Sequence, residues 1–215
     1  MSIGSSFQAL LAAVRRDRPH WEDAYSAFVA GLMATGAGAG APQVGERMPA
    51  FALPDSDGRW TRLADLLAEG PLVLSFQRGG WCPWCSVEMA AWGRAAPALH
   101  ADGGRLAVVT PETGGRATLL SERVGTGATL LCDVDHGVAM ALGLTVPLPE
   151  AISRRYRAAG LDLDQLTGGA GGFVPIPATF GIGRDGIVRY AFVNPDFRER
   201  AEPADVLNAL GIDQA

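Results

Sequence analysis

The residues best suited to chemistry stand in one short stretch of the chain, Trp81-Cys82-Pro83-Trp84-Cys85. An apolar run and two glycines precede it, and Pro83 favours a helix start there, because proline in a first helical turn loses no hydrogen bond. Cys82 then stands at the helix N-terminus, where free N–H groups and the helix dipole lower a thiol pKa. Cys85 follows one turn later on the same face. The spacing therefore predicts a dithiol that can close to a disulfide.

Four neighbours are candidates to support this pair. Glu88, three residues after Cys85, could relay a proton, and Arg78 could stabilise a thiolate or an anionic substrate. The commoner position of such residues is a solvated surface, and that is where we expect both. Trp81 and Trp84 supply either an apolar collar for a substrate or core packing.

Composition excludes several kinds of chemistry. All 18 basic residues are arginine, so the chain of 215 residues contains no lysine for a Schiff base or a phosphate-binding loop. The net charge of −5 and the scattered arginines argue against a nucleic-acid partner. Cationic help to a thiolate must therefore come from arginine, the N-terminus or backbone dipoles, and a guanidinium cannot act as the base.

Cysteine usage and apolar runs indicate the compartment. The third cysteine is Cys132, and an odd count with one close pair fits a reducing compartment better than a secreted disulfide framework. Residues 1–18 lack the order of charges and apolar residues found in a signal peptide. No apolar stretch approaches the roughly 20 residues that cross a bilayer, so we expect a cytoplasmic protein without a membrane contact.

The chain divides by pattern into an arm and a domain. Residues 5–34 predict two helices separated at Pro19, and the glycine- and alanine-rich residues 36–42 predict a flexible linker. We place the boundary there, with an arm and linker at residues 1–42 and a domain at residues 43–215. The arm either packs or dimerises, or it forms a lid over the active site.

Strands and helices alternate in the domain. This order predicts an α/β fold with a mixed central sheet flanked by helices. Residues 148–175 form an insertion that the alternation does not need, helical to about residue 159 and then glycine-rich, which is either a substrate-side loop or decoration. The predicted strands are 51–53, 71–76, 105–110, 128–131, 179–183 and 187–193, and the predicted helices are 61–68, the pair of cysteines to about 101, 117–124, 136–142 and 203–210.

Several segments carry a resemblance to a known family: residues 45–51, 53–55, 72–76, 131–142 and 179–186. They resemble the alkyl hydroperoxide reductase and thiol-specific antioxidant family, the peroxiredoxin-like branch of the thioredoxin fold. The resemblance covers about three quarters of the chain. It implies a thioredoxin-like fold, reduction of peroxides, no bound cofactor and an external thiol reductant such as thioredoxin.

The motif departs from the family at the active site. The family's Pro-x-x-x-Thr-x-x-Cys signature aligns with Arg78, Cys82 and Cys85, so only the peroxidatic position, Cys85, is kept. Pro177 stands where the family usually holds a peroxide-binding arginine. With Thr179 two residues later, it looks like the cis-proline that thioredoxins place beside their cysteine pair, where it would expose backbone to a substrate strand.

Two enzyme hypotheses follow, and they assign the attacking sulfur differently. In a peroxidase, Cys85 attacks the peroxide and Cys82 resolves the sulfenic acid. In a thioredoxin-like protein disulfide oxidoreductase, Cys82 attacks and Cys85 resolves the mixed disulfide. The family-like frame favours peroxide reduction, whereas the helix N-terminus favours Cys82 as nucleophile. The sequence leaves a homodimer open.

A zinc-binding structural module is a less favoured alternative. The cysteine pair together with Cys132 and His136 has the composition of a three-cysteine, one-histidine site. Against it, the proline and tryptophans around the pair suit a redox helix start, and a lone cysteine such as Cys132 is most often a small buried hydrophobe.

Overall fold

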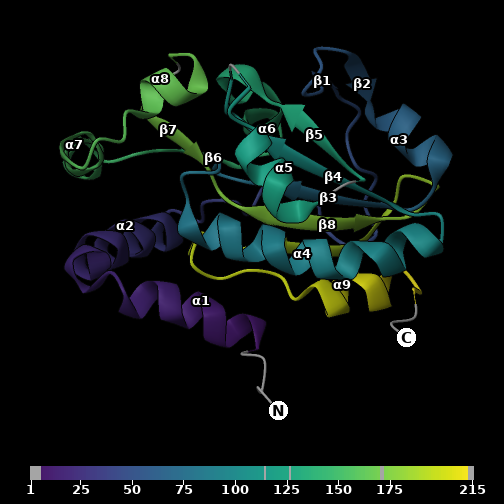
Figure 1. The fold of residues 1–215 in the computed structure, drawn as a ribbon, viewed down its shortest axis with the longest axis horizontal. Coiled ribbons are helices and arrows are strands. Elements are labelled where there is room, and N and C mark those ends of the chain that lie inside the picture. Colours follow the sequence, from purple (N-terminus) through teal and green to yellow (C-terminus); the bar gives the residue numbers. More distant parts are fainter. Residues whose placement is uncertain (1–5, 114, 126, 170–171, 213–215) are drawn as a thin grey trace.

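A mixed five-stranded sheet forms the centre of the computed structural model, which describes residues 6–113, 115–125, 127–169 and 172–212. The strand order is β5-β4-β3-β8-β9 (Figure 1). The central strand β3 is parallel to β4, which is parallel to β5, whereas β8 is antiparallel to both β3 and β9. The predicted mixed sheet is confirmed. The strands are β3 (Leu72–Phe76), β4 (Arg105–Thr110), β5 (Ala128–Cys132), β8 (Ala178–Ile182) and β9 (Val188–Val193).

Helices cover both faces of the sheet. All five residues of β3 are buried, and they alternate between two cores, with Val73 on one face and Leu72, Leu74 and Phe76 on the other. This is the pattern of a strand covered on both sides. The first core contains α4 (Pro83–Ala101), α5 (Thr118–Val124) and α9 (Pro203–Ala209), and the second contains α3 (Leu63–Glu69) and α6 (Gly137–Ala141), which follows the short turn η2 (Val134–His136).

A small hairpin replaces the start of one predicted helix. β1 (Ala52–Pro54) pairs with β2 (Trp60–Arg62), although residues 61–62 were expected in a helix. Asp55 explains the difference, because its Oδ1 accepts the N–H groups of residues 57 and 59 at 2.9 Å and so closes the turn. The helix α3 begins only after this turn, at residue 63.

The N-terminal arm packs against the first core. It consists of α1 (Phe7–Arg16), a short turn η1 (Pro19–Trp21) and α2 (Glu22–Ala34), so the predicted break at Pro19 is confirmed. The expected flexible linker is wrong, because residues 36–42 form consecutive hydrogen-bonded turns and Ala41 is buried. The boundary at residues 42 and 43 stays a prediction.

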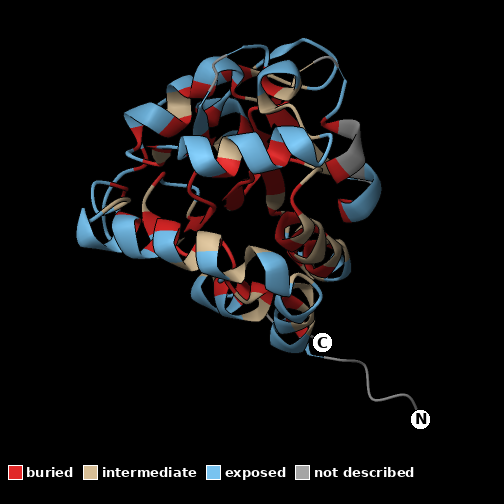
Figure 2. Cartoon of the chain, turned by 90° about the vertical axis from the view of Figure 1, so that its left-hand side faces the viewer, coloured by how far each residue is buried: buried red, intermediate tan, exposed pale blue. Residues whose placement is uncertain are grey.

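The insertion contributes two helices and one strand of a second small sheet, and it lies beside the arm. β6 (Thr145–Pro147) pairs with β7 (Phe173–Pro175), and between them lie α7 (Glu150–Ala158) and α8 (Leu163–Thr167). Seen from the side of α2 and α7, the helices turn buried residues inward and exposed residues outward (Figure 2). Among the described residues, no helix combines the length and apolar character needed to span a membrane.

Candidate active site

The cysteine pair lies where β3 leads into α4. Gly79 turns the chain there with φ +132°, and a Cβ at this position would lie 2.7 Å from Cδ of Glu112, so the turn requires glycine. The N–H of Gly80 donates to Glu112 at 2.8 Å, and burial raises the pKa of this carboxyl. The predicted helix start is confirmed, with Cys82 as the N-cap residue and Pro83 in the first turn.

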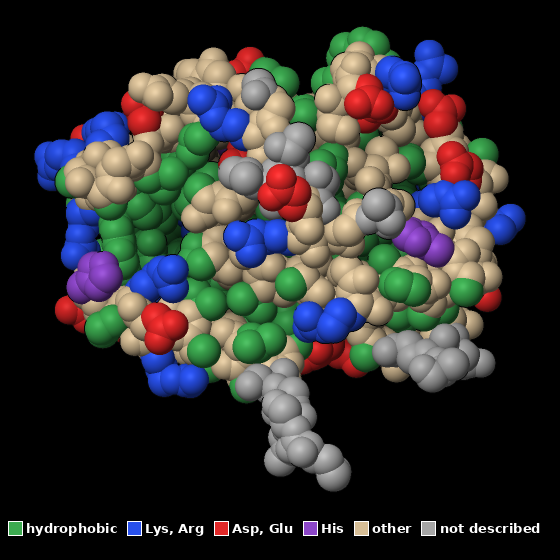
Figure 3. All heavy atoms as spheres, in the orientation of Figure 1, with side chains coloured by type: hydrophobic (Ala, Val, Ile, Leu, Met, Phe, Trp, Pro, Cys, Tyr) green, Lys and Arg blue, Asp and Glu red, His purple; other side chains and the backbone are tan. Residues whose placement is uncertain are grey.

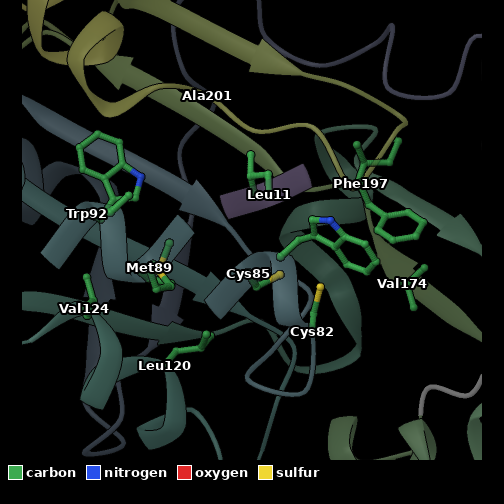
Figure 4. Close-up of a cluster of buried hydrophobic side chains, with 14 of the residues drawn as sticks. Leu11, Cys82, Cys85, Met89, Trp92, Leu120, Val124, Val174, Phe197 and Ala201 are labelled. Atoms are coloured by element: carbon green, nitrogen blue, oxygen red, sulfur yellow. The ribbon is translucent and has the colours of Figure 1, made fainter. Parts of the chain in front are cut away.

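The two thiols are free, buried and in contact. Cys82 is 1% exposed and Cys85 0%, and their sulfurs lie close together at the start of α4 (Figure 4). Burial alone would raise the pKa of Cys82, but a hydrogen bond from the Cys85 thiol and the charges of Arg78 and Arg200 lower it to about 5. Burial and the hydrogen bond to Cys82 raise the pKa of Cys85. Of the two thiols, Cys82 is therefore the one that ionises more readily.

Arg78 is buried, so the expectation of a solvated charge is wrong. Its side chain is among the largest fully buried ones, and its guanidinium lies 4.2 Å from the ring centre of Phe197 and 4.8 Å from that of Trp81. Nη2 donates to Oη of Tyr156 at 3.5 Å. Within the described residues, Nε and Nη1 have no hydrogen-bond partner, and no carboxylate pairs with this group. Tyr156 and then Cys82 are the groups whose charge acts most strongly on Arg78, and a thiolate on Cys82 would pair with it.

Glu88 is also buried, again contrary to the expected surface position. Its Oε2 lies 2.7 Å from Nε of Arg200 and accepts from Nε2 of Gln77 at 3.0 Å, while its Oε1 accepts from Oγ1 of Thr179 at 3.0 Å. Nη2 of Arg200 lies 3.4 Å from Sγ of Cys85. The carboxylate therefore holds the arginine that contacts the second sulfur.

Arg200 is the site residue that the sequence analysis missed. It stands 115 residues after Cys85, in the segment between β9 and α9, within a run of charged residues that looks like surface. The sequence holds no local signal for this role, because the place of Arg200 in the site depends on contacts with Glu88 and Cys85, which lie far from it in the chain.

Aromatic side chains from the arm and the insertion meet over the cysteines. Tyr25 of α2 and Tyr156 of α7 are joined by a hydrogen bond of 3.1 Å between their hydroxyl groups. Trp84 is buried and packs edge-on against Tyr25 and Phe197, whereas the half-buried Trp81 packs against Tyr156. We call these five residues the aromatic cover. Trp84 thus belongs to the core, and the arm lies over the site.

Pro177 does not form the expected cis bond. The described residues contain no cis peptide bond, and Pro177 is buried beside a small cavity that Arg78 and Phe197 also line. The trans form is the intrinsically favoured one, and here the chain runs on extended from β7 into β8. The N–H of Ile176 donates to the carbonyl of Leu144, so this backbone is paired within the protein rather than offered to a substrate.

The described residues do not form the ligand set that a zinc site would need. In the part of the chain that the structure describes, no three Cys, His, Asp or Glu residues are grouped to hold a metal ion. Cys132 is half-buried at the end of β5, opposite Thr110, and burial raises its pKa. His136 is buried, and burial lowers its pKa.

The central strand leads through a glycine turn into a helix that begins at the Cys-x-x-Cys segment, and an antiparallel hairpin lies beside it in the mixed sheet. These features define a thioredoxin-fold protein with a dithiol site. Residues 44–191 match the AhpC/TSA family, and the chain belongs to that family. No curated protein sequence matches it.

Solved structures of peroxiredoxins share the fold. Peroxidoxin BcpB from Mycobacterium tuberculosis superposes with a TM-score of 0.60 at 21% identity, covering 79% of this chain and 97% of that one. A cysteine-to-serine mutant of peroxiredoxin 6 from Arenicola marina gives 0.60 at 17% identity, covering 78% and 71%. The bacterioferritin comigratory protein of Xanthomonas campestris gives 0.56 at 18% identity, covering 75% and 90%. The predicted family and fold class are confirmed.

Proposed function

We propose that this protein reduces hydrogen peroxide or organic hydroperoxides through a Cys82/Cys85 dithiol–disulfide cycle in which Cys82 attacks. Membership of the AhpC/TSA family makes the chain a thiol-dependent peroxidase or oxidoreductase. The observation that carries the assignment is the lowered pKa of Cys82 beside Arg78, in contrast with the raised pKa of Cys85. The roles of the two cysteines are thus the reverse of those that the family signature implies, in which Cys85 attacks the peroxide and Cys82 resolves the sulfenic acid.

The cycle balances without a bound cofactor. The Cys82 thiol ionises and releases its proton to water. The thiolate attacks the terminal peroxide oxygen, the O–O bond breaks, and the departing alkoxide takes up that proton through water to leave as an alcohol, or as water from hydrogen peroxide. The sulfur is now a sulfenic acid. The Cys85 thiol attacks it, a disulfide forms, and hydroxide leaves with the thiol proton as water. An external thiol, which we propose to be thioredoxin-like, then returns two electrons and two protons.

Arg200 is placed to assist the second step. Its Nη2 lies 3.4 Å from Sγ of Cys85, and Glu88 fixes its orientation. A guanidinium at this distance stabilises the thiolate that Cys85 becomes as it attacks. Thr179 and Gln77 hold the carboxylate in turn.

Disulfide exchange with a protein partner is the second candidate. The same low pKa of Cys82 at a helix N-terminus favours it, because the N-terminal sulfur of such a pair is the one that attacks a disulfide. Against it stands the aromatic cover, which leaves Cys82 only 1% exposed. The substrate, a peroxide or a protein disulfide, separates the two candidates.

Cysteine substitutions test the assignment. In Cys85→Ser, one equivalent of peroxide should leave a sulfenic acid on Cys82 that dimedone traps and mass spectrometry locates. Cys82→Ser should consume peroxide no faster than free cysteine. Sulfenic acid on Cys85 in Cys82→Ser would reverse the order of attack. If the wild type consumes peroxide no faster than free cysteine, the peroxidase proposal fails, and reduction of insulin disulfides then tests the second candidate.

The state of the cysteines bears on the cellular compartment of the protein. Three cysteines, all free in the structure, suit a reducing compartment, and we propose the cytoplasm. A homodimer stays a prediction.

A further inference from the structure

Both sulfurs are closed off from solvent in the reduced protein. Cys82 is 1% exposed and Cys85 is 0% exposed. A reagent that reaches Cys82 must therefore pass the side chains that cover it, and whatever moves most easily among them decides what enters.

Two residues of the aromatic cover come from segments that lie outside the central sheet and its flanking helices. Tyr25 belongs to the arm and Tyr156 to the insertion, and the hydrogen bond of 3.1 Å between their hydroxyl groups joins the two segments. Tyr156 also accepts from Nη2 of Arg78. Burial raises the pKa of Tyr25 far above its usual value, so this phenol stays protonated. Both tyrosines belong to the same buried cluster as Trp84 and Phe197, and the half-buried Trp81 packs against that cluster.

The outer side of this junction is held by solvent-exposed contacts. Nη2 of Arg155 donates to the carbonyl of His20 at 2.8 Å, and its guanidinium lies 4.8 Å from the ring centre of Trp21. Trp21 in turn stacks on Tyr25 at 5.1 Å. Exposed polar contacts contribute little to stability, so this outer edge is the part of the junction between α2 and α7 that opens at the lowest cost.

The approach to the site is apolar. The surface is hollowed between α2 and α7, and hydrophobic side chains line the hollow (Figure 3). Beneath α2 lies a small cavity of about 10 Å³, lined by Phe28, Leu32, Val174, Pro177 and Arg78 among others. Walls of this kind suit a small uncharged molecule better than a charged or extended one.

We propose that Tyr25 and Tyr156 form a gate that sets, by size, which molecules reach Cys82 in the reduced protein. A small separation of the two rings admits hydrogen peroxide or a small organic hydroperoxide. A bulky hydroperoxide or a protein disulfide requires α2 and α7 to move apart, so it reacts slowly. This proposal rests on the proposed peroxidase function and names the size class of its substrates.

Rate constants for peroxides of two sizes test the gate. Wild type should react more slowly with cumene hydroperoxide than with hydrogen peroxide. Tyr156→Phe removes the hydroxyl bond but keeps the ring, and Arg155→Met loosens the outer contact. Each should raise the ratio of cumene to hydrogen peroxide rate constants by about fivefold, the effect of losing one hydrogen bond. Tyr190→Phe, a matched change outside the aromatic cover, should leave the ratio as it is. An equal ratio in all four proteins overturns the proposal.

Alkylation tests the gate without any peroxidase activity. In a Cys132→Ser background, with each rate divided by that of the same reagent with free cysteine, iodoacetamide should modify Cys82 much faster than a polyethylene-glycol maleimide does. Iodide leaves in the first reaction, and in the second the thiol adds across the maleimide double bond. Tyr156→Phe and Arg155→Met should speed the bulky reagent more than the small one. Equal labelling of Cys82 in the Cys132→Ser parent by both reagents, corrected for their rates with free cysteine, overturns the gate. Size-selective labelling without peroxide consumption would instead retain the gate and reject the peroxidase function.

Discussion

Replacing Arg78 with methionine should raise the pKa of Cys82. The change removes a buried positive charge and keeps much of the side-chain volume that packs against Phe197. An opposite charge in contact with an acid lowers its pKa by about 1 to 3, so a value of about 5 in the wild type should become roughly 6 to 8 in Arg78→Met. The hydrogen bond from Cys85 and the charge of Arg200 remain, which keeps the pKa below that of a free thiol.

The ultraviolet absorbance of the thiolate, followed against pH, measures this change. At about pH 5.5 the thiolate fraction, and with it the rate constant for peroxide, should fall roughly threefold if the pKa becomes about 6 and more than about a hundredfold if it becomes about 8. Arg189→Met is the control, since this arginine is exposed, pairs with Asp185 and lies outside the aromatic cover. If Arg78→Met titrates like wild type, Arg78 is not the counter-ion of Cys82 and the assignment of the attacking sulfur loses its support.

Three further predictions concern the buried ion pair, the thiolate and the glycine turn. Glu88→Gln leaves a buried arginine unpaired and should lower the free energy of unfolding by about 3–5 kcal/mol in urea melts, whereas Glu69→Gln, in an exposed ion pair, should cost about 0–1 kcal/mol. The pKa of Cys82 is about 5 in the folded protein and about 8.5 in an unfolded chain, so between these pH values the unfolded state holds a proton that the native state has lost. The free energy of unfolding of the reduced protein should therefore rise with pH across this range, and the rise should be absent in Cys82→Ser. Gly79→Ala forces a side chain into a closed turn and should lower the free energy of unfolding by about 1–3 kcal/mol and abolish most of the activity. In the control, Gly31→Ala, the new Cβ meets open space, so this change should be neutral or stabilising. Equal melting curves for the two variants would refute the steric argument.

The sequence predicts well whatever depends on local pattern. The strand at residues 105–110 agrees with β4 at both ends, and the helix that begins at the cysteine pair ends at residue 101. Proline at a helix start and continuous apolar runs are local signals, so they can be interpreted without knowing the fold. The pairing of β6 with β7 has no such signal, because both are three residues long and end in proline.

The charged part of the site depends on contacts between distant segments. Glu88 and Arg78 look like surface residues because their partners, Arg200 and Tyr156, stand 112 and 78 residues away in the chain. Periodicity and spacing carry no information about such contacts. For the same reason the sequence does not decide whether the arm packs, dimerises or forms a lid, because a lid depends on the contact between Tyr25 and Tyr156 across the site.

The unpaired charge of Arg78 also bears on the reduction potential of the cysteine pair. Glu88 neutralises Arg200, and the Cys82 thiolate neutralises Arg78. Oxidation to the disulfide removes that thiolate and leaves a buried guanidinium without an anion, so the charge balance favours the reduced form. Dithiols whose reduced form is stabilised in this way are strong oxidants, and the couple should lie above the value of about −270 mV of thioredoxin. Electrons from a thioredoxin-like donor would then flow downhill into this site.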